Sequence, residues 1–135
     1  MEKITIEAET DNLQEVIDFA TGLLEEHECP MKVVMQMELV IEEIFVNVSS
    51  YAYRPDVGNV TLCVDFAENP AAVEMTFIDS GRPYNPLERD DPDTTLGIDE
   101  REIGGLGIFL VKKNVDDIAY EFTDGKNILR IKKIF

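Results

Sequence analysis

Two polar side chains stand inside an otherwise apolar stretch of the chain, Met37 to Tyr53. Such a composition is typical of a helix packed inside a domain. Glu43 and Asn47 lie one helical turn apart, so they share a face of that helix. An amide oxygen can bind a hard cation, and a carboxylate can orient or deprotonate a nucleophile. The pair is equally compatible with a solvent-facing glutamate and a core amide whose hydrogen bonds are satisfied.

A second candidate is Asp79, which ends an alternating segment and precedes Gly81. A carboxylate at the end of a strand can accept a hydrogen bond from an exocyclic amine, such as the amino group of adenine. A glycine next to it lets a flat ligand approach the backbone, because no side chain is in the way. An aspartate that only begins a turn would show the same pattern.

The third candidate is the glycine-rich run Gly104-Gly105-Leu106-Gly107, which precedes the apolar segment Ile108 to Lys113. Glycines let backbone N–H groups turn towards a phosphate, and the N-terminus of a helix adds partial positive charge. The run is neither a P-loop nor a Rossmann fingerprint, because no G-x-G-x-x-G follows the first strand. A hinge for a mobile loop would look the same. Taken together, the three features predict a nucleotide site with the Met37–Tyr53 helix as its floor.

Composition limits the partners of this site. The chain has 135 residues, which predicts one domain over residues 1–135. Its net charge of −16 argues against nucleic acid and anionic membranes, which bind basic patches. A polyanionic ligand must therefore bring a cation or meet focused backbone N–H groups. Cys29 and Cys63 suit no metal spacing and indicate reduced thiols in a cytoplasmic protein. No apolar run approaches membrane-spanning length.

Apolar residues around the three candidates recur either at every second position, as in strands, or at every third or fourth position, as in helices. Helices are predicted from Leu13 to about Glu28, from Pro30 through Tyr53, and after the glycine-rich run. A turn at Asp124-Gly125 joins the last two strands. The polar, acidic connection at residues 87–103 has the length of a functional loop or lid. Strands are predicted at Lys3–Ala8, Asn59–Phe66, Ala72–Asp79, Asp117–Phe122 and Asn127–Ile134.

This order of elements predicts an α/β (α+β) fold, a two-layer sandwich with a mixed, mostly antiparallel sheet and its helices on one face. The three motifs, in their order and separation, resemble the N, G1 and G2 boxes of the GHKL superfamily, whose members share the Bergerat ATP-binding fold. The single-domain length and the sequences DSGRPYNP and GGLGIFLVKKNVDDIAYE are most similar to the anti-sigma-factor serine kinases, which carry a histidine kinase-like ATPase domain.

The resemblance implies a role for each motif residue. Asn47 would coordinate Mg²⁺, Asp79 would hold the adenine amino group of ATP, and Gly81 would line the base. Glu43 would be the general base that activates the attacking group. The run of Gly105, Leu106 and Gly107 would lie against the phosphates beneath the lid.

The resemblance also implies a function: an ATP-Mg²⁺-dependent serine/threonine protein kinase that phosphorylates an anti-sigma-factor antagonist, regulates a sigma factor and forms a homodimer. The alternative is a nucleotide-binding regulatory module without phosphoryl transfer. Glu43 favours the kinase, because a nucleotide sensor needs no base. A histidine kinase catalytic domain fits less well, because dimerisation helices and a credible phosphoacceptor histidine are missing from the sequence.

The chain departs from the family pattern at three places. Tyr51 stands where the family often has a histidine, which mildly favours the module without transfer. Pro83 replaces the second glycine that many members carry after the aspartate. The threonine of the late strand is not evident, and Asn127 is the polar residue nearby.

Overall fold

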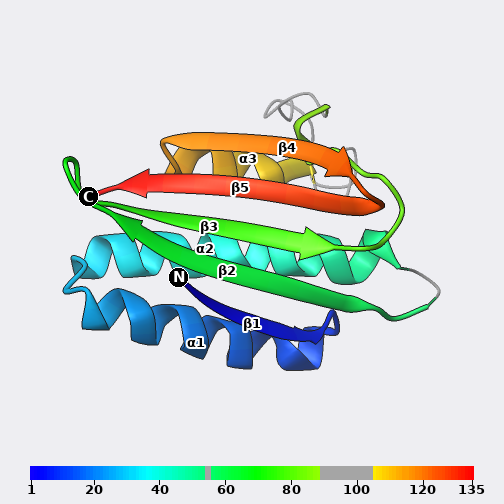
Figure 1. Ribbon diagram of the computed structural model, residues 1–135, viewed down its shortest axis with the longest axis horizontal. Helices are drawn as coiled ribbons and strands as arrows, with labels where there is room; N and C mark the ends of the chain where they lie inside the picture. The colour runs from blue at the N-terminus through cyan, green and yellow to red at the C-terminus, as the bar shows by residue number, and fades with distance from the viewer. Residues whose placement is uncertain (54–55, 89–104) are drawn as a thin grey trace.

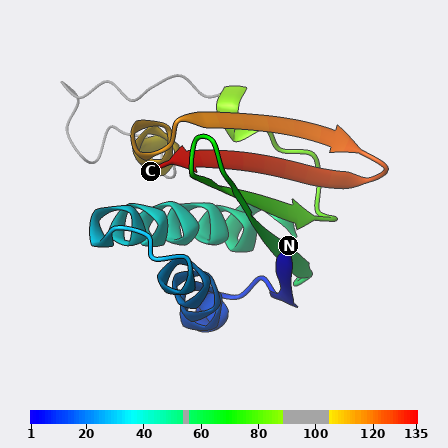
Figure 2. The same ribbon diagram turned by 60° about the vertical axis from the view of Figure 1, so that its left-hand side comes forward.

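The computed structural model describes residues 1–53, 56–88 and 105–135. They form two layers, a five-stranded sheet and a layer of α-helices on one of its faces (Figure 1 and Figure 2). The predicted two-layer α/β fold is therefore confirmed. Most of the predicted lid, residues 87–103, lies outside the described residues. Only Leu87 and Glu88 belong to the described part, in the 3₁₀ turn η3 (Pro86–Glu88).

The elements follow the predicted order, with their ends shifted by a few residues. The largest shift concerns the central helix, in which α-helical geometry ends at Asn47 and the π-helical turn η2 (Val48–Ala52) follows. A short 3₁₀ turn, η1 (Thr10–Asn12), leads into the first helix. The main elements are β1 (Glu2–Glu7), α1 (Leu13–Glu26), α2 (Met31–Asn47), β2 (Asn59–Ala67), β3 (Ala72–Asp79), α3 (Gly105–Asn114), β4 (Asp117–Thr123) and β5 (Lys126–Ile134).

Strand β3 is central in the sheet, whose order is β1-β2-β3-β5-β4. All pairings among these strands are antiparallel, where the sequence had predicted a mixed and mostly antiparallel sheet. The β4–β5 hairpin turns at Asp124 and Gly125, whose φ angles are 52° and 74°. Positive φ at both central residues is what a type I′ hairpin requires.

The register between β3 and β5 decides where polar groups of the sheet meet. Phe77 lies opposite Leu129, and Asp79 lies opposite Asn127. Alternate residues of a strand point to the same face, so these pairs all point towards the helices. The apolar row of the sheet therefore ends in one buried polar pair.

Helix α2 lies in the middle of the helical layer, between α1 and α3 (Figure 1). Its composition suggests burial all round, yet one stripe at helical spacing is exposed, at Met31, Met35, Glu38 and Glu42. The opposite side enters the core through Val33, Val34, Met37, Val40, Ile41, Ile44 and Phe45. Within the described ranges, no helix has both the length and the apolar character needed to cross a membrane.

Candidate functional site

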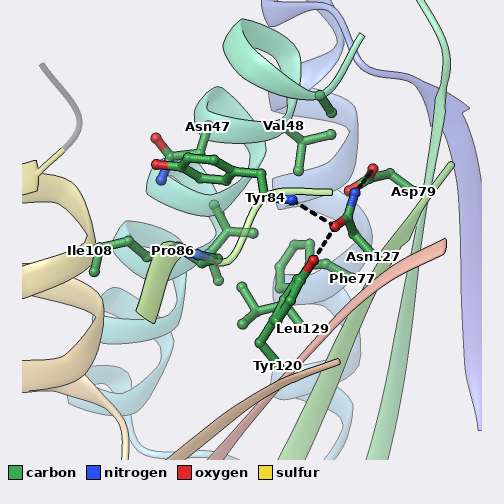
Figure 3. A pocket seen from close by; sticks show the side chains of 12 residues that line it. Asn47, Val48, Phe77, Asp79, Tyr84, Pro86, Ile108, Tyr120, Asn127 and Leu129 are labelled. Atoms are coloured by element: carbon green, nitrogen blue, oxygen red, sulfur yellow. Dashed lines mark hydrogen bonds between the residues drawn. The ribbon is translucent and has the colours of Figure 1, made fainter. Parts of the chain in front are cut away.

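A pocket lies where the ends of β3 and β5 meet the end of α2 (Figure 3). Its volume is about 40 Å³, which holds only a few water molecules. The polar lining residues are Asn47, Asp79 and Asn127, and the others are Ile44, Val48, Ala52, Phe77, Tyr84, Pro86, Ile108, Tyr120 and Leu129.

Asp79 ends β3 and is only 6% exposed. Its Oδ1 accepts hydrogen bonds from the backbone N–H of Gly81 and from Nδ2 of Asn127, both at 2.9 Å. The other oxygen, Oδ2, has no hydrogen-bond partner among the residues that the structure describes. Burial raises the pKa of Asp79, and the two hydrogen bonds oppose that rise. Because a buried acceptor without a donor is costly, Oδ2 marks a position suited to a donor group of a ligand.

Asn127 is 5% exposed, yet both ends of its amide are hydrogen-bonded. Besides Asp79, its Nδ2 donates to the backbone carbonyl of Arg82 at 2.9 Å. Its Oδ1 accepts from the N–H of Tyr84 at 3.1 Å and from the hydroxyl of Tyr120 (Figure 3). Sequence reasoning assigns Asn127 no role. The signal that could have found it is a polar residue ending an alternating apolar row, as Asp79 does on β3.

Gly81 lies where the turn after β3 passes close to the end of η2. A β-carbon on Gly81 would overlap the carbonyl oxygen and the β-carbon of Ala52. The N–H of Arg82 donates to the same Ala52 carbonyl at 3.0 Å. The fold itself therefore requires glycine here, because any side chain would push the turn away from η2. A contact between Gly81 and a base stays a prediction.

Asn47 and Glu43, the two polar residues of α2, are placed differently. Asn47 is the last residue of α2 and lines the pocket together with Asp79. Glu43 is half-buried one turn earlier and is not part of the pocket lining. Burial raises the pKa of Glu43, and the negative charge of Glu42 raises it further. The structure thus brings Asn47 to the pocket of Asp79 and leaves Glu43 beside it on the helix.

The sequence predicts that the glycine-rich run precedes a helix at Ile108 to Lys113, but the helix begins within the run. Helix α3 begins at Gly105, so Gly105, Leu106 and Gly107 form its first turn, whereas Gly104 lies outside the described residues. The next residue, Ile108, lines the pocket. The first N–H groups of a helix have no partner within it and carry partial positive charge. This end of α3 is therefore suited to the anionic part of a ligand held by Asp79.

A buried carboxylate at a strand end, an asparagine on the facing helix and a glycine-rich helix start thus lie together in a domain of two-layer α/β architecture. Residues 6–133 match the model of the histidine kinase-like ATPase domain. The chain belongs to this family.

The chain is also similar to proteins named as serine-protein kinases. The chain is 28% identical over 105 residues to the serine-protein kinase RsbW of Bacillus thuringiensis (strain Al Hakam), and the match covers 75% of this chain and 64% of that protein. It is 27% identical, with the same coverage, to RsbW of Bacillus anthracis. The chain thus spans somewhat less than two thirds of these relatives. A crystal structure of the RsbU and RsbW domains of Rv1364c from Mycobacterium tuberculosis superposes with a TM-score of 0.66 at 14% identity, over 99% of this chain and 33% of that one, which shows the shared fold.

Proposed function

We propose that this protein binds ATP with Mg²⁺ and transfers a phosphoryl group to a serine or threonine of an anti-sigma-factor antagonist, thereby regulating a sigma factor. The observation that carries the proposal is that Oδ2 of buried Asp79 has no hydrogen-bond partner among the described residues, in the pocket that Asn47 also lines. The RsbW relatives, named as serine-protein kinases, support the kinase rather than another ATP-dependent activity.

The described residues fit each part of the nucleotide. Asp79 Oδ2 would accept a hydrogen bond from the adenine amino group, since an ionised carboxylate is a strong acceptor. Asn47, whose side chain has no hydrogen-bond partner in the described part of the chain, would offer its amide oxygen to Mg²⁺. The first turn of α3, from Gly105 to Gly107, would contact the phosphates. In a protein of net charge −16, bound Mg²⁺ supplies charge that offsets repulsion of the polyphosphate.

Glu43 would be the general base of the transfer. It would accept the proton of the attacking hydroxyl while that hydroxyl is held in line with the phosphoryl group. The raised pKa of Glu43 makes it a stronger base than an ordinary carboxylate, provided that it stays ionised at neutral pH. Because Glu43 lies outside the pocket lining, it suits a hydroxyl delivered from outside the pocket by a protein substrate. A homodimer, which the family resemblance implies, belongs to the same proposal.

The test is incubation of the protein with labelled ATP-Mg²⁺ and candidate antagonist proteins from the same genome. Label on a serine or threonine of one antagonist supports the kinase. Calorimetric binding of ATP-Mg²⁺ without transfer to any antagonist would instead establish a regulatory module in which the nucleotide only sets conformation. Absence of ATP binding would refute both functions.

A further inference from the structure

Tyr53 connects three parts of the fold through one hydroxyl group. The residue follows η2, and its hydroxyl donates to the backbone carbonyl of Asn59, at the start of β2, at 2.7 Å. The same oxygen accepts the backbone N–H of Ser80 at 2.7 Å. Ser80 directly follows Asp79, so the hydroxyl connects the end of the central helix to the turn that follows the buried carboxylate.

The surroundings of Tyr53 are shaped to hold its ring in this place. A β-carbon on Gly58 would overlap the ring of Tyr53, so the loop before β2 leaves room for the ring only because residue 58 is glycine. Ala52, the neighbouring residue, accepts the N–H of Arg82 at 3.0 Å. Two adjacent residues at the end of η2 therefore hold two backbone N–H groups of one turn, those of Ser80 and Arg82.

The π-helical geometry of η2 contributes to this arrangement. Relative to a regular α-helix, a π-helical turn contains an additional residue, which rotates the following residues by about 100° about the helix axis. Tyr53, directly after Val48–Ala52, would face a different direction on a regular continuation of α2. The irregular turn thus directs the Tyr53 hydroxyl to Ser80.

We propose that Tyr53 is a positioning residue: it holds the turn from Ser80 to Arg82 against the end of η2, and thereby aims Asp79 Oδ2 at the amino group of the bound base. This role rests on the proposed ATP binding. Tyr53 does not line the pocket, so it acts through Ser80 and Asp79 rather than on the ligand.

The ionisation of Tyr53 is consistent with this role. Burial raises the pKa of its hydroxyl, the hydrogen bond from Ser80 lowers it, and the nearby charge of Asp79 raises it. The net rise keeps the hydroxyl protonated at physiological pH, so it can donate to Asn59 while it accepts from Ser80.

The test compares ATP with purine riboside triphosphate, which lacks the amino group that Asp79 is proposed to accept. In the wild-type protein the analogue should bind at least about tenfold more weakly, the usual effect of losing a hydrogen bond to a charged group. In Tyr53→Phe the ratio of the affinity for ATP to the affinity for the analogue should fall to within about threefold. The reason is that a misaligned carboxylate no longer distinguishes the two ligands. A merely structural role would weaken both ligands equally and leave the ratio unchanged.

Two further variants test whether the effect depends on the position of the Tyr53 ring and whether loss of an unrelated hydroxyl has the same effect. Gly58→Ala should displace the ring and reduce the ratio as Tyr53→Phe does, although Gly58 lies outside the pocket lining. Thr61→Val is the matched control: it removes the hydrogen bond between the Thr5 and Thr61 hydroxyls at 2.8 Å, on the same strand as Asn59. It should leave the ratio at the wild-type value.

Amide hydrogen exchange in the protein without nucleotide tests the contact independently of ATP. The Ser80 amide should exchange at least about tenfold faster in Tyr53→Phe than in the wild type, because its acceptor is lost. An unchanged Ser80 rate, or an unchanged ligand ratio, would overturn the role of Tyr53 while leaving ATP binding intact. Failure of the wild-type protein to bind ATP would overturn the proposed function and the positioning role together.

Discussion

The two ends of the pocket differ in how far the protein has organised them without a ligand. At the Asp79 end, Oδ1 and the whole amide of Asn127 are hydrogen-bonded, and both residues are buried. At the Asn47 end, neither the Asn47 side chain nor that of the neighbouring Glu43 has a hydrogen-bond partner among the described residues, and both residues are half-buried. The Asp79 end is thus organised by hydrogen bonds of the fold, whereas the Asn47 end has polar side chains that a ligand could bind.

The difference follows from the elements that carry each end. Asp79 and Asn127 are locked in register by the central strands, whose other inward residues form the core. Asn47 instead ends a helix whose next turn is irregular. A preorganised acceptor favours one base orientation at little entropic cost, whereas free side chains adapt to a cation and its phosphates. Variants at the two ends should therefore affect different measurements.

The largest effect is expected for Glu43→Gln, which keeps the shape and removes the basicity. Phosphoryl transfer should slow by about 10²–10⁴-fold, the usual contribution of a general base. ATP affinity should change by less than a few-fold, because Glu43 does not line the pocket. The matched control is Glu38→Gln at an exposed position of α2, which should leave both values near wild type. Similar rates for Glu43→Gln and wild type would make Glu43 structural.

Asp79→Asn should act on binding instead. One acceptor oxygen becomes an amide group that can present a donor to the adenine amine. The expected loss is about 1.5–3 kcal/mol, roughly ten- to a hundredfold in ATP affinity by calorimetry. Asp65→Asn makes the same chemical change at an exposed position of β2 and should have no such effect. Equal affinity of wild type and Asp79→Asn would refute the adenine assignment.

Stability measurements should separate the two asparagines. Asn127→Ala removes the donor to buried Asp79 and the acceptor of the Tyr84 N–H and the Tyr120 hydroxyl, so the free energy of unfolding should fall by about 2–4 kcal/mol. Asn47→Ala breaks no described hydrogen bond and should change it by less than about 0.5 kcal/mol, while weakening Mg²⁺-dependent ATP binding. Urea denaturation of both variants provides the comparison. A large destabilisation by Asn47→Ala would show that this end, too, is organised without ligand.

The smallest effect concerns pH and Asp79. Its pKa is raised in the folded protein, so its contribution to stability is fully present below the unfolded pKa and is lost as pH rises through the folded value. ATP binding needs the ionised form and should weaken by at most about tenfold per pH unit below the folded pKa. Lowering the pH through this window should thus favour folding and disfavour binding. The difference between wild type and Asp79→Asn in how stability and ATP affinity depend on pH gives the contribution of Asp79 alone. Parallel pH profiles of the two proteins would contradict the proposed role of Asp79 in binding adenine.

Much of the fold could be predicted from local patterns. Alternation in the strands and the Asp124-Gly125 turn depend on residues close in sequence, so the order of elements and the β4–β5 hairpin followed from the chain alone. The same applies to the position of Asp79 at a strand end and to the glycines that begin α3. The exposed stripe of α2 was not predicted. Met31 and Met35 are apolar residues, which the sequence pattern assigns to the core, but both are exposed in the structure.

What only the tertiary structure decided is how distant segments meet. The pairing of Asp79 with Asn127 depends on the register between β3 and β5. These strands are not joined by a hairpin, so no turn in the sequence indicates their register. The hydrogen bond between Ser80 and Tyr53 depends on a π-helical turn that the sequence pattern does not predict. The need for Gly81 likewise comes from the approach of Ala52 rather than from a ligand. Residue types and spacing thus determined which polar groups the chain carries. Packing between elements determined which oxygen of Asp79 has no hydrogen-bond partner among the described residues.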